Sequence, residues 1–133
     1  MSASHYTVAT TKTVEAALAA VEQALARRQF AVLWHLDINA KLVEKGLEPG
    51  PAFHVLEVCS APRAKAALTT TQQVGYFLPC KVVVYSDQAT GGTRIGLQRP
   101  QLMVDLIGDP ALRPLAEEVE GLLVGAVDEA AEG

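Results

Sequence analysis

The strongest constraint on the fold is that four short segments rich in β-branched and aromatic residues lie between two amphipathic helical segments. These strand-like segments span residues 30–38, 52–59, 80–86 and 93–99. Gly91 and Gly92 predict a hairpin turn between the last two. A weaker alternating segment, residues 5–9, precedes the first helix. This order predicts an α+β fold in which a mostly antiparallel five-stranded sheet carries two long helices on one face.

The two long helices are predicted from apolar residues at near-helical spacing. The first runs from about Val14 to Arg28, with Thr11 or Thr13 as its cap. The second begins near Leu112 and continues to about Val127. Shorter helices are expected after Asn39, after Ser60 and after Pro100. The carboxylates of Glu117, Glu118 and Glu120 are assigned to the solvated face of the last helix.

Side-chain alternation divides the predicted strands into two faces. The face beneath the helices is expected to hold Val32, Trp34, Leu36, Leu56, Val58, Val82, Val84, Ile95 and Leu97. The other face holds Leu33, His35, Asp37, Phe53, Val55, Glu57, Val83, Tyr85 and Arg94. It is too apolar to be fully exposed to water, so either a second copy of the chain, in a homodimer, or the short helices are expected to cover it. Glu57 and Lys81 are expected to pair across neighbouring strands.

Composition limits the class of protein. The 133 residues suit one α+β domain, residues 1–133, and the net charge of −4 with no basic stripe argues against nucleic acid as the main partner. No apolar stretch approaches the length of a membrane span, and no signal peptide is visible. The expected compartment is therefore the cytoplasm, where thiols stay reduced.

Cys59 and Cys80 are the only two cysteines, and their context singles them out as a candidate site. Cys59 ends one predicted strand and Cys80 begins the next, so antiparallel pairing places both at the same end of the sheet. Strict alternation nevertheless assigns them to opposite faces. Three alternatives follow: the strands end before the cysteines, a bulge intervenes, or the thiols do not meet. Buried free cysteines also serve simply as small apolar residues.

Three functions are compatible with this pair. The leading prediction is a binding site for a small ligand or a soft metal such as copper, with Cys59 and Cys80 as ligands. The histidines His5, His35 and His54 are scattered along the chain, and His5, expected at the cysteine end of the sheet, is the best third ligand. The alternatives are a thiol-disulfide redox enzyme, with Cys59 attacking and Cys80 resolving, and a structural or partner-binding module.

Three segments resemble the domain of unknown function family 302. They are residues 30–38, residues 56–62 and residues 78–85, of which the Leu-Pro-Cys-Lys-Val-Val-Val run is the most specific, and it is similar to a cysteine-pair subgroup of that family. The resemblance implies a TATA-binding-protein-like β-α-β(4)-α arrangement without a nucleic-acid role. Commoner members carry Glu-Ile-Asp-His where this chain has residues 35–38, and only Asp37 matches. No role of that Asp-His pair is therefore carried over.

Overall fold

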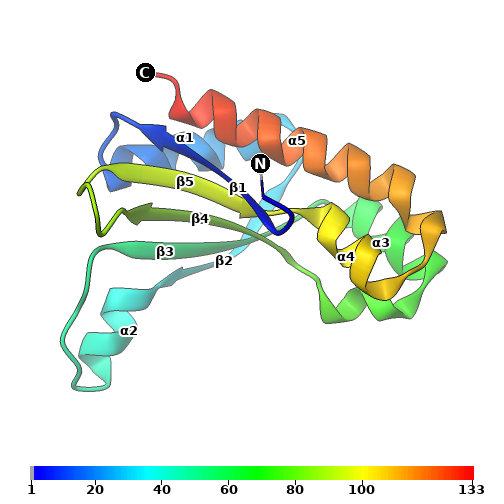
Figure 1. Ribbon diagram of the computed structural model, residues 1–133, viewed down its shortest axis with the longest axis horizontal. Coiled ribbons are helices and arrows are strands. Elements are labelled where there is room, and N and C mark those ends of the chain that lie inside the picture. Colours follow the sequence, from blue (N-terminus) through cyan, green and yellow to red (C-terminus); the bar gives the residue numbers. More distant parts are fainter. Residues whose placement is uncertain (1) are drawn as a thin grey trace.

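The computed structural model describes residues 2–133, which form one antiparallel sheet with helices at one face and at both ends (Figure 1). The strands are β1 (His5–Thr10), β2 (Ala31–Asp37), β3 (Phe53–Cys59), β4 (Cys80–Ser86) and β5 (Thr93–Gln98). The helices are α1 (Val14–Arg27), α2 (Ile38–Glu44), α3 (Ala61–Thr70), α4 (Pro100–Ile107) and α5 (Arg113–Ala131). Two 3₁₀ helices, η1 (Gln72–Tyr76) and η2 (Pro110–Leu112), complete the order.

The strand order of the five-stranded sheet is β1-β5-β4-β3-β2, and all neighbours are antiparallel. Helices α1 and α5 lie side by side on one face, as Figure 1 shows. Thr13 caps α1, because its side chain accepts a hydrogen bond from the amide of Ala16. The predicted α+β architecture is confirmed.

The main core lies between the sheet and these two helices. Predicted residues of β3, β4 and β5 supply the sheet side, and all are buried: Leu56, Val58, Val82, Val84, Ile95 and Leu97. Helix α1 contributes Val21 and Leu25, and α5 contributes Leu123 and Val127. Alternation along three regular strands was therefore sufficient to identify this half of the core.

Strand β2 departs from the predicted alternation. Val32 pairs with Val58, but Trp34 pairs with Glu57, so Leu33 is an extra residue that forms a β-bulge. From Trp34 onward every side chain changes face. Trp34 is 53% exposed on the face away from the helices, and the prediction that it is buried under them is wrong. Leu36 moves to the same face, opposite Val55.

Replacement of Trp34 by Ala should therefore cost about 1–2 kcal/mol of unfolding free energy in dilute solution, because only half of the ring leaves contact with protein. A buried tryptophan would cost about 3–5 kcal/mol. Urea unfolding of Trp34→Ala beside the unmutated chain measures the difference. A loss of the larger size would contradict the exposed position of the ring.

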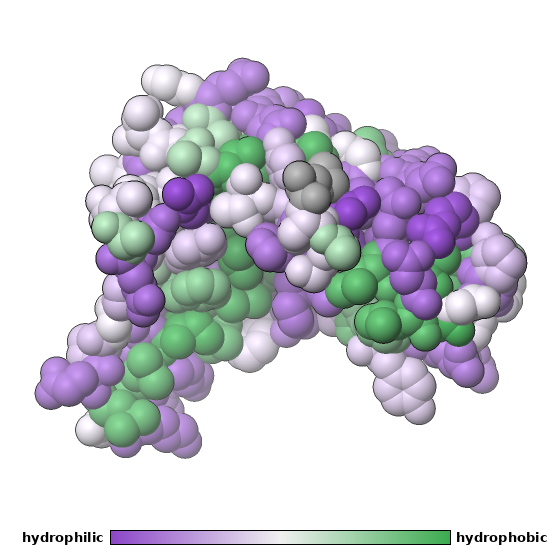
Figure 2. All heavy atoms as spheres, viewed as in Figure 1, coloured by the Kyte–Doolittle hydropathy of each residue, from purple (hydrophilic) through white to green (hydrophobic). Residues whose placement is uncertain are grey.

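The face of the sheet away from α1 and α5 is referred to below as the open face. Its apolar residues are Trp34, Leu36, Phe53, Val55, Val83 and Tyr85. The rings of Phe53 and Tyr85 stack there with centroids 4.9 Å apart. The predicted Glu57–Lys81 pair is confirmed on this face, with Nζ 3.9 Å from Oε1. Figure 2 shows apolar residues gathered in the hollow between the projecting helix α2 and the opposite end of the molecule.

The opposite end of the sheet carries a second, smaller core. Helices α3, α4 and the 3₁₀ helices η1 and η2 pack there against the start of α5. Their buried residues are Ala67, Val74, Val104, Leu112 and Ala116. No helix within residues 2–133 has the length and apolar composition that crossing a membrane would require.

Candidate functional site

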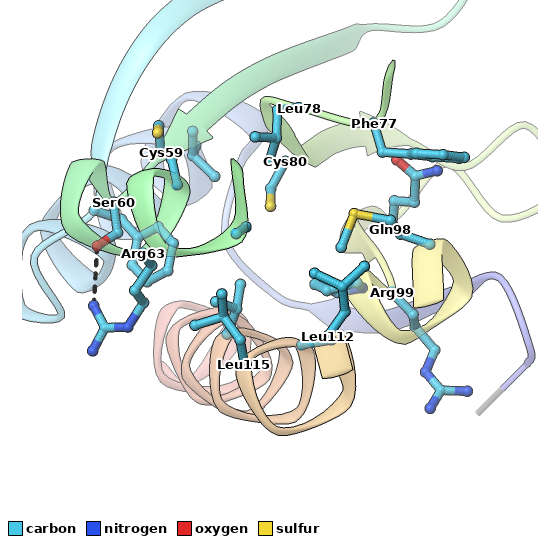
Figure 3. A pocket seen from close by; sticks show the side chains of 18 residues that line it. Cys59, Ser60, Arg63, Phe77, Leu78, Cys80, Gln98, Arg99, Leu112 and Leu115 are labelled. Atoms are coloured by element: carbon cyan, nitrogen blue, oxygen red, sulfur yellow. Dashed lines mark hydrogen bonds between the residues drawn. The ribbon is translucent and has the colours of Figure 1, made fainter. Parts of the chain in front are cut away.

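Cys59 and Cys80 lie on neighbouring strands at the same end of the sheet, as predicted, but their thiols do not meet. Val58 is the residue that pairs with Cys80, so Cys59 is one position further along and projects to the opposite face. Figure 3 shows the Cys80 sulfur directed into a cavity and the Cys59 sulfur directed away from it. Both cysteines are free.

This geometry bears on two of the predicted chemistries. A disulfide needs side chains that point toward each other, and two ligands of one metal ion need to converge. The predicted two-cysteine metal site and the alternative redox pair both require the thiols to converge, and this structure does not bring them together, because alternation along regular strands places the sulfurs on opposite faces.

His5 does not join the cysteines either. It lies on β1, and β5 separates it from β4. Its Nδ1 is hydrogen-bonded to the hydroxyl groups of Ser2, at 3.0 Å, and Ser4, at 2.8 Å. Among residues 2–133 no three His, Cys, Asp or Glu side chains are grouped to hold a metal ion. The predicted metal set of Cys59, Cys80 and His5 is therefore not assembled.

The structure forms a cavity of about 60 Å³ beside Cys80. The end of the sheet, helix α3, helix α4 and helix α5 enclose it (Figure 3). It lies where the main core and the smaller core adjoin. The side chains at facing positions of α3 and α5 are small, namely Ala64, Ala67 and Ala116, so the helices leave space between them. Met103 of α4 and Leu115 and Val119 of α5 complete the apolar wall.

Two arginines line the cavity with their methylene groups, while their guanidinium groups point outward (Figure 3). Arg63 lies over the Phe30 ring at 5.9 Å and donates to the Ser60 hydroxyl at 3.0 Å and to Glu118 at 3.3 Å. Arg99 points toward α5, where it meets Glu120. The interior is thus apolar, with the Cys80 thiol and the Met103 thioether as its polarisable groups.

Glu120 is buried, although the sequence predicts it on the solvated face of the last helix. It is 5% exposed rather than solvated. Its carboxylate accepts hydrogen bonds from the Arg99 guanidinium at 3.0 and 3.2 Å and from the Gln101 side chain at 2.9 Å. It also accepts from the Gln101 backbone amide at 3.3 Å, in the first turn of α4. Helix α4 has no capping side chain of its own at Arg99, so Glu120 supplies the cap from α5. The absence of a capping residue before Pro100 indicates that this helix end needs an acceptor from elsewhere, but it does not identify Glu120.

Burial changes the acidity of the thiol in the cavity. Desolvation raises the pKa of Cys80 to about 11, and the nearby Cys59 thiol adds to the shift, against a smaller opposing effect of Lys81. Cys80 therefore remains a protonated thiol near neutral pH. It has neither the nucleophilicity of a thiolate nor the charge that soft-metal binding requires.

Comparisons with known proteins agree with this fold. A search of curated proteins gave no match. The crystal structure of an uncharacterized conserved protein DUF302 from Bacillus stearothermophilus is 37% identical and superimposes with a TM-score of 0.90, covering 96% of this chain and 98% of that one. The family model described as domain of unknown function DUF302 matches residues 6–130. The chain therefore belongs to the DUF302 family, as its strand segments indicated.

Proposed function

We propose that this protein binds a small apolar molecule in the cavity beside Cys80. The observation that carries the proposal is an apolar cavity of about 60 Å³ with a single thiol directed into it. Among residues 2–133 no buried side-chain polar atom lacks a hydrogen-bond partner, so the cavity offers a water molecule little to bind. Pockets lined mainly by apolar side chains take up apolar ligands.

The size of the cavity limits the ligand. An engineered cavity of about 150 Å³ accommodates benzene, so one of less than half that volume fits only a few carbon atoms in this conformation. The occupant is therefore a small apolar molecule or the apolar end of a longer one. The outward arginines do not place a charged group inside (Figure 3). Cys80 contributes a polarisable surface and Ala64 and Ala67 contribute the space.

Cys80→Leu tests the proposal by filling the cavity from within. Because empty volume adjoins the thiol, this variant should lose less than about 0.5 kcal/mol of unfolding free energy. Val84→Leu is the matched control, since Val84 lies on the same strand and the same face but is fully buried in the main core. It should lose about 1–3 kcal/mol by overpacking. Urea unfolding measures both, and equal losses would contradict the presence of usable space.

Ligand uptake is measured on the same variants. Titration of isotope-labelled protein with xenon, and separately with butanol, should shift the amide resonances of Ala64, Ala67 and Leu115 in the unmutated chain. Cys80→Leu should abolish these shifts and Val84→Leu should retain them. Shifts confined to other residues, or shifts that persist in Cys80→Leu, would overturn the proposal.

The free thiols also suit the reducing cytoplasm, where we expect the protein to act.

We also propose that the chain forms a homodimer through the open face. Within residues 2–133 no helix covers the apolar residues of this face, and Phe53 remains 36% exposed. Helix α2 beside it has seven residues and buries none of them, with Val43 57% exposed. So short a helix is marginal without packing. A second copy would cover both the face and the helix.

Phe53→Glu should convert the dimer to a monomer, because a carboxylate in the centre of an apolar interface loses its hydration without gaining a partner. Leu106→Glu is the control: Leu106 is 64% exposed, but it lies on α4. Light scattering measures the mass of each. A monomer for the unmutated chain at micromolar concentration would contradict the proposal.

A further inference from the structure

Two histidines that are 19 residues apart in the chain face each other across strands β2 and β3. Nε2 of His35 and Nδ1 of His54 share a hydrogen bond of 2.7 Å, and the ring centroids are 5.0 Å apart. His35 pairs with Leu56 and Asp37 pairs with His54, so the two histidines are diagonal neighbours on one face of the sheet. This pair is separate from the cavity and from Cys59 and Cys80, at the other end of β3.

The β-bulge at Leu33 creates this pair. Without the extra residue, continuation of the Val32–Val58 register would place His35 opposite Val55, on the face that His54 does not occupy. The bulge moves His35 to the Leu56 face and leaves Trp34 exposed. Bulges recur where a side chain has to be redirected at a functional site. The same register shift that brings the two imidazoles together also exposes Trp34.

We infer that His35 and His54 form a two-imidazole binding site for Cu²⁺. Imidazole nitrogen is a preferred ligand of copper, nickel and zinc ions. The sheet neighbours of His54 are Asp37 and Val84, so no basic side chain faces it from the adjoining strands. Asp37 adds a negative charge next to the pair, while its Oδ1 accepts a hydrogen bond from the Ala40 amide at the start of α2.

Copper(II) is favoured over the other divalent metals because the affinity of nitrogen sites for first-row divalent ions is highest for Cu²⁺. With metal–nitrogen bonds of about 2.0–2.1 Å, two neighbouring ligands of a square-planar ion are about 2.9 Å apart. A tetrahedral zinc ion requires about 3.3 Å, and a linear copper(I) ion requires about 4 Å. The ion replaces the proton of the 2.7 Å hydrogen bond, so the two nitrogens have to move apart, and they move least for the square-planar geometry. His35 is exposed, so water can occupy the remaining positions of the ion.

The test is titration with Cu²⁺ followed by electron paramagnetic resonance, in a Cys59→Ser background. This background removes a partly exposed thiol that could reduce the metal. The parent should show a tetragonal spectrum with splitting from two nitrogens. His35→Gln and His54→Gln should each lose the second nitrogen and bind about a hundredfold more weakly, because a chelating pair becomes a single ligand.

His5→Gln is the matched control, since it removes the remaining histidine, on the opposite edge strand of the sheet. It should leave the spectrum and the affinity unchanged. A two-nitrogen spectrum that survives both His35→Gln and His54→Gln, or one that disappears in His5→Gln, would overturn the inference. Displacement of Cu²⁺ by an equal concentration of Zn²⁺ would overturn the choice of copper.

Discussion

Replacing Glu120 by Ala should lower the free energy of unfolding by about 3 kcal/mol, because it leaves the Arg99 guanidinium without its counter-charge. The Glu120 side chain is 7% exposed and that of Arg99 is 21% exposed, so water can replace the lost contacts only in part. Removing one partner of a fully buried ion pair costs about 3–5 kcal/mol. The partial exposure of Arg99 places the expected loss at the lower end.

The loss should extend to helix α4. Glu120 is the acceptor for the Gln101 amide in the first turn of that helix, and Arg99 is held by the same carboxylate. Hydrogen exchange of the Gln101 amide should therefore accelerate more than global unfolding explains, since local opening exposes helix ends first. Because α4 forms one wall of the cavity through Met103, the variant should also weaken xenon uptake.

Glu118→Ala is the matched control for this prediction. Glu118 lies on the same helix and pairs with Arg63, but its side chain is 54% exposed. Exposed ion pairs contribute less than about 1 kcal/mol. Urea unfolding of the two variants gives the comparison directly. If both variants lost the same free energy of unfolding, the burial of Glu120 would not determine how much its ion pair stabilises the protein.

Raising the pH from 9 to 11 should lower the free energy of unfolding by about 2 kcal/mol through the titration of Cys80. Its pKa is raised from 9.0 to about 11 in the folded protein, mainly by burial. The folded thiol therefore retains its proton over this range while the unfolded thiol loses it. Since the folded state binds more protons, stability is fully present below pH 9 and falls as pH rises to about 11. Each pKa unit corresponds to about 1.4 kcal/mol, so the complete titration amounts to about 3 kcal/mol, of which about 2 kcal/mol falls between pH 9 and 11.

The measurement is the difference between the unmutated chain and Cys80→Ala, because the difference cancels the titration of lysines and tyrosines elsewhere. Alkylation gives an independent readout: protonation alone should slow the reaction of Cys80 by about a hundredfold at pH 8 relative to an unperturbed thiol. Cys59→Ala isolates the Cys80 signal. Fast alkylation of Cys80 at pH 8, or a pH-independent difference, would contradict its burial.

The element order and the main core were predictable because they depend on local spacing. Residues of β3, β4 and β5 alternate without interruption, so the sequence predicted the buried positions from Leu56 to Leu97. The spacing of Val14, Val21 and Leu25 predicted the buried face of α1. Alternation also predicted that Cys59 and Cys80 point to opposite faces. The sequence left open whether a bulge or an early strand end would change this.

The sites depend on contacts between segments that are distant in the chain, and only the tertiary structure decided those. One extra residue at Leu33 exchanged the two faces of β2, which exposed Trp34 and brought His35 to His54. Helical spacing placed Glu120 on α5 but carried no information about Arg99 approaching it across 21 residues. Local sequence determines which way a side chain points relative to its own backbone. Register and packing determine what it meets there, because a single inserted residue costs little locally and changes every contact beyond it.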